Sequence, residues 1–155
     1  MLSRVQARYR EQASGMTLAD GLEEYYVLNT GIVRRPDDLP AESRDLFRSH
    51  DLCHVIFGLT TSLADETLAD LRTVLCTDVG LRRYLRYLRD PEARKLFASL
   101  SFRDIVGGMA AAAPRIPRAL LQRTQITRPW PWRPPDAFLQ RTLADLRGEF
   151  GIRVI

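Results

Sequence analysis

Apolar residues recur along this chain at the three- and four-residue spacing of an amphipathic helix. Within residues 62–76 the leucines fall at positions 63, 68, 71 and 75, and residues 136–150 show a similar spacing. No segment alternates apolar and polar residues as a half-buried strand does, and no internal repeat is present. The pattern predicts an all-α protein, a single-domain helical bundle over residues 1–155.

Capping residues, glycines and prolines set the ends of the predicted helices. Thr17 followed by Asp20, and Ser62 followed by Asp65, are typical of helix starts, and Gly58 is typical of a helix end. Further starts are predicted at Asp78, Asp90 and Ser101. The predicted helices span residues 18–29, 41–58, 63–75, 79–89, 91–100, 102–113 and 136–150. The domain therefore divides into a short N-terminal region (1–39), a hairpin (40–76), middle helices and a closing helix (136–150).

The hairpin contains His50 and His54, the only two histidines of the 155-residue chain, in the segment SHDLCHVIFG. Residues i and i+4 share one face of an α-helix, so both imidazoles can reach one point. The neighbouring residues are apolar, which places that point in the core, where an imidazole without a polar partner costs free energy. Either a metal ion or hydrogen bonds to neighbouring acids would satisfy the pair.

The same hairpin supplies acidic side chains to the histidines. With the turn centred near residue 60, position 54 faces position 66, which is Glu66. Asp51 can bind at the edge of the site or accept a hydrogen bond from an imidazole, and Asp70 can stand across from His50. Two histidines with carboxylates form an open metal site. We therefore predict a divalent metal between two antiparallel helices, Zn²⁺ first, with Fe²⁺ and Mg²⁺ as alternatives.

Composition and charge bear on partners and location. The net charge is +4, and the stretch between Asp104 and Asp136 has no acidic residue but five arginines. It carries no recognised nucleic-acid motif, so we expect no nucleic acid partner; its apolar and basic residues suit a peripheral membrane surface. No run reaches the roughly 20 apolar residues of a membrane span. Two cysteines without ligand-pair spacing or a secretory signal predict a reducing, cytoplasmic setting, with contact at the inner face of the membrane.

Several features of the chain allow more than one interpretation. Trp130 and Trp132 either sit at a lipid headgroup interface or pack on the bundle from a proline-fixed crossing loop. Gly107 and Gly108 allow close helix approach, for ordinary packing, for a homodimer contact or for an isoprenoid tail. Cys53 is expected to be a buried structural thiol.

The segment HDLCHVIFGLTTSLADE carries His50, Asp51, His54 and, after eleven further residues, Glu66. This pattern resembles the metal signature of the coenzyme Q biosynthesis protein four family. The C-terminal FLQRTLADLRGEFGI is similar to the closing helix of that family. The resemblance covers roughly residues 40–155. It implies an all-helical protein at the membrane surface that binds a divalent metal, commonly zinc, through those four residues.

The resemblance also implies a function in ubiquinone biosynthesis. The protein would be a metal-dependent oxidative decarboxylase that removes the C1 carboxylate of a prenylated hydroxybenzoate with hydroxylation, and it would organise other ubiquinone-biosynthesis proteins. The metal would act as a Lewis acid, and Asp51 or Glu66 would move protons. With no flavin, haem or nucleotide motif in the sequence, the oxidant would be oxygen or come from a partner. The brief N-terminal region also allows a bacterial relative with a different substrate.

Two other classes of protein were weighed against this enzyme. The alternative that stays open is a non-catalytic isoprenoid-lipid-binding scaffold whose metal is structural. A phosphohydrolase of the HD type is suggested by the doublet of His50 and Asp51, but that class needs a further histidine before the doublet. The sequence has none, so this class is excluded.

Overall fold

The computed structural model of the protein describes residues 7–98 and 100–155. Its regular structure is helical, and none of the described residues lies in a β-strand, which confirms the all-α prediction. The α-helices are α1 (Leu18–Leu28), α2 (Ala41–Phe57), α3 (Leu63–Cys76), α4 (Gly80–Leu88), α5 (Pro91–Ala98), α6 (Phe102–Ala112), α7 (Ile116–Arg123) and α8 (Leu143–Phe150). Short 3-10 helices span Arg8–Arg10, Pro36–Asp38, Ala113–Arg115 and Asp136–Gln140.

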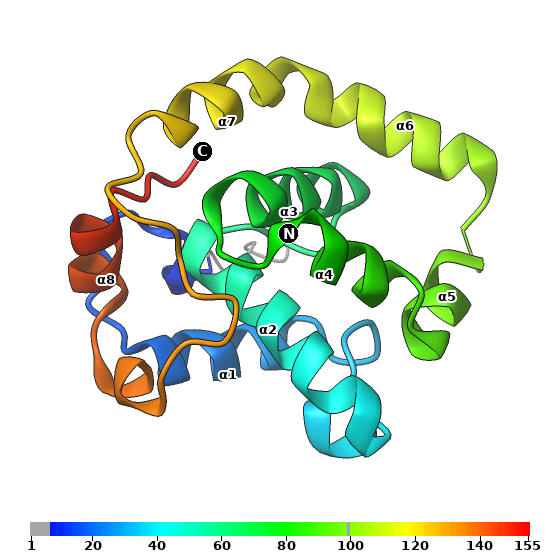
Figure 1. The fold of residues 1–155 in the computed structure, drawn as a ribbon, viewed down its shortest axis with the longest axis horizontal. Helices are drawn as coiled ribbons and strands as arrows, with labels where there is room; N and C mark the ends of the chain where they lie inside the picture. The colour runs from blue at the N-terminus through cyan, green and yellow to red at the C-terminus, as the bar shows by residue number, and fades with distance from the viewer. Residues whose placement is uncertain (1–6, 99) are drawn as a thin grey trace, which may run out of the picture.

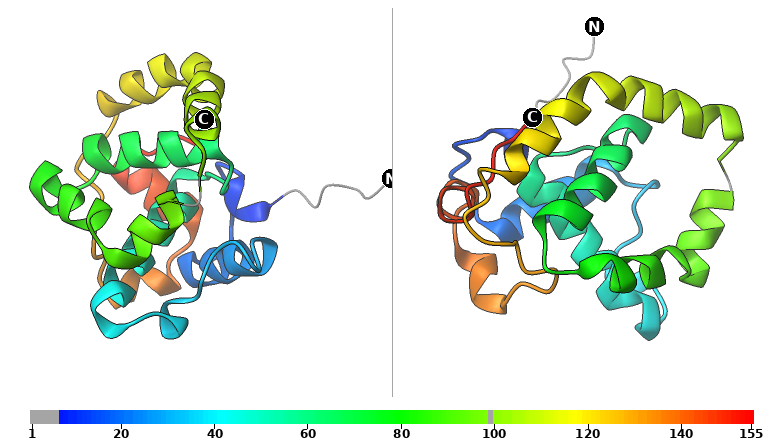
Figure 2. Two further views of the ribbon diagram at one scale, coloured as in Figure 1. Left: turned by 90° about the vertical axis from the view of Figure 1, so that its right-hand side faces the viewer. Right: turned by 45° about the horizontal axis from the view of Figure 1, so that its top comes forward.

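The hairpin of α2 and α3 lies at the centre of the fold (Figure 1). α1 packs against α2, and α3 is covered by α6 and α7, which run over it as an arch. Figure 2 shows from two further directions that this arch stays at the periphery of the molecule. α8 and α5 lie at opposite ends of the view in Figure 1. The facing residues of α2 and α3 are therefore enclosed by the other helices.

Side-chain caps begin three of the helices as the sequence predicts. Thr17, Ser62 and Ser101 each accept a hydrogen bond from the backbone N–H three residues further on. Each bond satisfies a donor that the first helical turn leaves without a partner. α2 ends at Gly58, whose φ of 70° is left-handed and costs a glycine little. These signals fix the ends of α2 and α3 and hence the register of the hairpin.

Two predicted helix boundaries are wrong. Asp78 does not cap α4; its carboxylate instead accepts a hydrogen bond from the backbone N–H of Trp132. The predicted closing helix over 136–150 is divided into a 3-10 helix and α8. The division arises because the Leu18 N–H donates to the carbonyl of Arg141, which ties the turn between the two pieces to the start of α1. Thr142 then caps α8 by accepting from the N–H of Asp145.

The stretch between Asp104 and Asp136 is more helical than the sequence predicts beyond the helix expected over 102–113. It contains α7, which the sequence analysis does not predict. Trp130 and Trp132 are buried, and Trp130 packs on Phe138 and Phe150, so the packing interpretation is confirmed and the headgroup interpretation is wrong.

Small residues and a thiol also pack as the sequence suggests. A Cβ atom on Gly108 would lie 2.6 Å from the Cβ of Leu63, so this glycine serves close packing of α6 on α3. Cys53 is a free, buried thiol, as expected. Across the described residues, no helix combines the length and the apolar character needed to cross a bilayer.

A buried arginine joins α8 to the C-terminal end of α2. Arg147 is fully buried, and its guanidinium donates to the carbonyl oxygens of Ile56, Val55, Tyr9 and Glu11 at 2.5–2.9 Å. The last carbonyls of an α-helix lack partners within the helix and carry partial negative charge. Arg147 therefore supplies both the donors and the positive charge that this end of α2 requires.

Candidate metal centre

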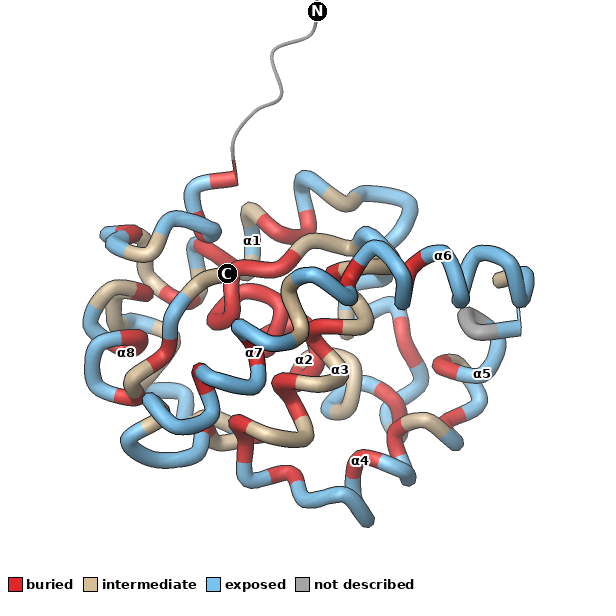
Figure 3. Tube along the Cα trace, turned by 90° about the horizontal axis from the view of Figure 1, so that it is seen from above, coloured by how far each residue is buried: buried red, intermediate tan, exposed pale blue. Residues whose placement is uncertain are grey.

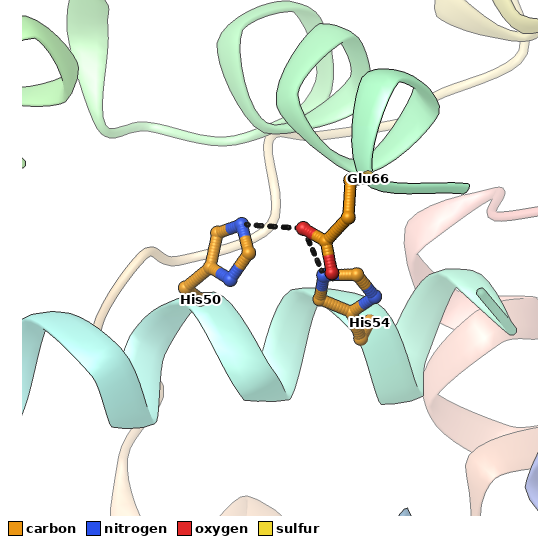
Figure 4. Close-up of side chains that lie close together, drawn as sticks. All are labelled: His50, His54 and Glu66. Atoms are coloured by element: carbon orange, nitrogen blue, oxygen red, sulfur yellow. Dashed lines mark ion pairs between the residues drawn. The ribbon is translucent and has the colours of Figure 1, made fainter. Parts of the chain in front are cut away.

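The candidate centre is formed by facing residues of α2 and α3 (Figure 4). His50 and His54 lie one turn apart on α2, and Glu66 lies in the first turn of α3. Because Gly58 ends α2 and Ser62 caps α3, the hairpin places Glu66 opposite His54, as the turn geometry predicts.

One carboxylate oxygen of Glu66 lies near both imidazoles. Its Oε2 atom is 3.3 Å from Nε2 of His54 and 4.0 Å from Nε2 of His50. One ligand atom from each of the three residues lies within 4.8 Å of the other two. Ligands that hold one Zn²⁺ at about 2.0–2.2 Å are separated by roughly 3–4 Å. Small side-chain adjustments would therefore bring all three onto a common ion.

His54 has an unmet need for a polar partner. Its side chain is 0% exposed, and neither ring nitrogen has a hydrogen-bond partner among the described residues. Glu66 is close enough, but the ring is not aligned for a hydrogen bond to it. Leaving a buried imidazole unpartnered costs free energy, which a bound metal ion would recover. The donor set of two imidazoles and a carboxylate fits a divalent ion such as Zn²⁺ or Fe²⁺.

Charge in the centre is set by mutual interaction between His54 and Glu66. Burial on its own lowers the pKa of His54, but the carboxylate of Glu66 outweighs burial and raises that pKa above its ordinary value. Burial raises the pKa of Glu66 in turn, and the His54 imidazole outweighs burial and lowers it. Without metal the two side chains therefore favour a charged pair, and a metal ion replaces the proton that the pair holds.

Asp70 adds a second carboxylate to the edge of the cluster. It lies one turn after Glu66 on α3, and its Oδ1 atom is 3.6 Å from Nε2 of His50. The same oxygen accepts a hydrogen bond from the hydroxyl of Tyr84 on α4. The ring of His50 stacks on Tyr87, also on α4, with centroids 5.1 Å apart. Two tyrosines of α4 thus position the side chains at this end of the site.

Asp51 is the predicted ligand that the structure does not bring into the group of three. Its carboxyl is buried and accepts a hydrogen bond of 3.1 Å from the hydroxyl of Tyr26 on α1. Burial raises the pKa of Asp51 to about 7, although the neighbouring His50 and the bond from Tyr26 both lower it. Asp51 still lines the pocket beside the cluster, so it can exchange a proton near neutral pH.

The cluster forms part of the wall of a pocket of about 550 Å³. His50, Asp51, Glu66 and Asp70 contribute polar groups to that wall. Much of the remaining lining is apolar or aromatic and includes Tyr25, Val33, Phe47, Leu63, Ile105 and Met109. Such a volume is typical of small-molecule sites, which combine an apolar lining with a few polar groups that orient the ligand. The pocket suits an amphiphile with a polar head and an apolar body.

An ion-pair group lies at the exposed rim of the pocket. Glu92 of α5 lies 2.6 Å from Arg34, in the segment between α1 and α2, and 2.6 Å from Lys95. All three side chains line the pocket, and both cations are mostly exposed to solvent. The rim is therefore polar on this side.

Sequence reasoning missed the tyrosines around the site. Tyr84 and Tyr87 lie three residues apart within an arginine-rich helix, and this apolar spacing was the available signal that α4 turns one face inward. The role of Tyr26 could not be predicted from residue spacing, because its hydrogen bond to Asp51 is a contact between two helices, α1 and α2. Comparisons of the chain with protein-family models, with curated proteins and with solved structures found no match. Function is therefore inferred from the geometry of the site and the sequence pattern that led to it.

Proposed function

We propose that the protein binds a divalent metal through His50, His54 and Glu66 and uses it on an amphiphilic ligand in the adjoining pocket. One observation carries this proposal: the fully buried imidazole of His54, which makes no aligned hydrogen bond, has ligand atoms of His50 and Glu66 within 4.8 Å, and those two residues line an apolar pocket. Asp70 is a further candidate ligand on geometry, and Asp51 is one by resemblance.

The ligand class follows from the pocket and from the sequence resemblance together. The pocket favours a compact polar head beside the histidines and an apolar body along the remaining lining. The resemblance to the coenzyme Q biosynthesis protein four family narrows this class to a prenylated hydroxybenzoate or a related isoprenoid aromatic. The proposed reaction breaks the bond between C1 and the carboxylate, which leaves as carbon dioxide while a hydroxyl group takes its place. The oxygen of that hydroxyl group comes from water, and the two electrons released pass either to dioxygen, which becomes hydrogen peroxide, or to an electron-accepting partner protein.

Each part of the site would have a separate role in this reaction. A bound divalent ion supplies Lewis acidity that stabilises negative charge on a carboxylate or phenolate of the ligand. Glu66 suits a ligand more than a base, because His54 keeps its pKa low. Asp51 suits proton transfer, because its carboxyl lies beside the cluster on the pocket wall, accepts a hydrogen bond from Tyr26, and has its pKa raised by burial in the metal-free protein. The apolar lining would exclude water from the ring and its chain.

The first test is metal content, measured by elemental mass spectrometry on protein purified without a histidine tag. Wild type should carry near-stoichiometric metal, and His54→Leu and Glu66→Gln should lose it while remaining helical by circular dichroism. Glu92→Gln is the matched control, since this acid lines the same pocket away from the cluster. Wild-type protein that is metal-free and cannot be loaded would make the proposal wrong.

A second measurement separates the enzyme from a lipid-binding scaffold with a structural metal. The loaded protein is incubated with a prenylated hydroxybenzoate in air, with and without a cell extract as the source of partners, and carbon dioxide release is followed. The enzyme predicts release that stops in His54→Leu and continues in Glu92→Gln. The scaffold predicts no release under any condition and unfolding of the protein when a chelator removes the metal.

A further inference from the structure

The five tyrosines of the chain are all buried, with exposed fractions of 6% or less. A buried tyrosine usually has a hydrogen-bond partner for its hydroxyl. Three of the hydroxyls donate to an oxygen of another residue, namely those of Tyr9, Tyr26 and Tyr84. The hydroxyls of Tyr25 and Tyr87 form no hydrogen bond with another described residue. These two hydroxyls therefore have donor capacity that the described part of the chain does not use.

The same two tyrosines are the ones that line the pocket. Tyr25 on α1 and Tyr87 on α4 belong to its wall, and the other three tyrosines do not. Tyr25 stacks on His54 with ring centroids 5.4 Å apart, and Tyr87 stacks on His50. α4 is exposed over most of its length, and Figure 3 shows single buried positions interrupting that exposed path. Neither hydroxyl is among the unpartnered polar atoms sealed from solvent, so each borders open space, and the pocket is the open space that both residues line.

The carboxylates of the cluster lie near both hydroxyls without bonding to them. Burial raises the pKa of Tyr25, and the carboxylates of Asp51 and Glu66 raise it further. Burial also raises the pKa of Tyr87, and Glu66 and Asp70 add to that effect. Both hydroxyls are therefore protonated at neutral pH and can donate hydrogen bonds beside the candidate metal ligands.

A carboxylate is the polar head that fits two such donors next to a metal site. Its two oxygens offer about four lone-pair positions, so it can bind a metal ion and accept hydrogen bonds at the same time. A head without an acceptor would leave both hydroxyls unpartnered in a largely apolar pocket, which costs free energy.

We propose that Tyr25 and Tyr87 donate hydrogen bonds to the anionic oxygens of the pocket ligand, so that the site selects an acid over a neutral amphiphile of the same shape. The position of this acid beside the histidines rests on the proposed function. The two tyrosines come from helices on either side of the hairpin in the sequence, so α1 and α4 together determine which head the pocket accepts.

The test compares two probes that differ only in the head: 4-octylbenzoate, and 4-octyltoluene, in which a methyl group replaces the carboxylate. Binding to the zinc-loaded full chain is measured by equilibrium dialysis. Tyr25→Phe and Tyr87→Phe should each weaken the binding of 4-octylbenzoate by about tenfold, because each removes one charge-assisted hydrogen bond. The affinity for 4-octyltoluene should stay within about twofold, because the ring and its packing on the histidine are kept.

Tyr9→Phe is the matched control. Tyr9 is as buried as Tyr25 and packs on its ring with centroids 6.0 Å apart, but its hydroxyl donates to the carbonyl of Leu59, away from the pocket. The control should bind both probes as wild type does and unfold at a lower urea concentration, because the carbonyl of Leu59 loses its donor. Tyr25→Phe and Tyr87→Phe lose no hydrogen bond in the absence of ligand, so they should unfold at the same urea concentration as wild type or a higher one. An unchanged affinity of these two variants for 4-octylbenzoate, or an equal loss for both probes, would overturn the proposal.

The same titrations on chelator-treated protein separate this inference from the proposed function. Zinc should raise the affinity of wild type for 4-octylbenzoate, because the metal offsets the repulsion between the acid and the carboxylates of the cluster. If zinc has no effect while the two phenylalanine variants still lose affinity for the acid alone, the proposed metal centre is wrong and the assignment of the tyrosines is supported. If zinc strengthens binding and the variants change nothing, the metal centre is supported and the assignment of the tyrosines is wrong. An acid that binds wild type in neither state also overturns the assignment.

Discussion

Two buried polar side chains near the C-terminal end of α2 differ in how their hydrogen bonds are met. At its C-terminal end Arg147 is fully buried, and four carbonyl oxygens accept its hydrogen bonds. His54, which directly precedes Val55 in α2, is also fully buried, yet neither ring nitrogen makes an aligned hydrogen bond among the described residues, although Oε2 of Glu66 lies 3.3 Å from Nε2. The first side chain has its hydrogen bonds within the chain, whereas the second has an acidic neighbour and no aligned hydrogen bond.

This difference separates stability from function. A buried charged side chain whose hydrogen bonds are all made stabilises one conformation. Removing that side chain takes a hydrogen-bond donor away from each of its acceptors. A buried polar group without partners is costly, and such groups persist where a ligand or metal supplies the missing contacts. We therefore expect substitutions at Arg147 to change the free energy of unfolding and substitutions in the histidine cluster to change binding.

The largest effect is expected for Arg147→Met, which keeps the volume of the side chain and removes its donors. Four carbonyl oxygens then lose a donor, three of them on the buried residues Tyr9, Val55 and Ile56, and the free energy of unfolding should fall by about 3–5 kcal/mol. Urea denaturation followed by circular dichroism measures it. Arg141→Met is the control: this arginine is partly exposed and pairs with Glu149, so the loss should stay below about 1 kcal/mol. Equal losses in the two variants would contradict the interpretation.

His54→Leu should affect metal affinity more than the free energy of unfolding, which is the reverse of what we expect for Arg147→Met. Metal affinity should fall by about 100-fold or more, because one of three ligands is lost and a single ligand is worth several kcal/mol. The stability of the metal-free protein should change far less than in Arg147→Met, because the lost pair with Glu66, whose side chain is 34% exposed, is offset by an apolar side chain of similar size at a buried position. Competition titration with a chromophoric chelator gives the affinity, and urea denaturation with chelator gives the stability. A metal-free variant several kcal/mol less stable than wild type would show that His54 is a core residue.

Local signals made much of the centre predictable from sequence. The cap at Ser62 and the glycine at Gly58 fix the lengths of α2, the turn and α3, and this register alone places Glu66 opposite His54. Contacts between residues far apart in the sequence could not be predicted. The hydroxyl of Tyr26 on α1 holds the carboxyl of Asp51, and no spacing within α2 reports that contact.

The closing segment teaches the same lesson for the fold. Its apolar spacing reads as one helix, but Leu18 and Met16 bond the backbone on either side of Thr142 and divide it. α7 was missed because Pro114 and Pro117 lie before it and in its first turn, where they suggest a loop, and because the buried Ala119 that packs it inward is too small to create an apolar pattern. Helix ends with a local cap were predictable, whereas helix ends set by hydrogen bonds to a segment distant in the sequence were not.

Asp51, which lies beside the histidine cluster, provides a test based on the pH dependence of stability. Its pKa is raised to about 7, so the folded protein holds this proton more tightly than the unfolded chain does. Stability from Asp51 is therefore present at low pH and is lost as pH rises from about 4 to about 7. In metal-free protein Asp51→Asn should remove that loss, which makes the variant more stable above pH 7 by on the order of 2–4 kcal/mol. Urea denaturation with chelator at pH 5 and pH 8 measures it, and a stability difference that shrinks toward pH 8 would be the wrong sign.

The smallest expected effect is a change in metal affinity that tests which carboxylate, Asp70 or Asp51, completes the metal site. Asp70 lies 3.6 Å from Nε2 of His50, whereas Asp51 is held by Tyr26. Asp70→Asn should therefore lower metal affinity by about tenfold, the range for a group that orients or completes a metal site, and Asp51→Asn should lower it less. Tyr84→Phe should weaken binding by a smaller factor in the same direction as Asp70→Asn, because the hydroxyl of Tyr84 positions that carboxylate. The reverse order, with Asp51→Asn the more damaging change, would mean that Asp51 leaves Tyr26 to bind the metal. The four-residue ligand set implied by the sequence resemblance would then hold, and Asp70 would belong to the packing of α3 against α4.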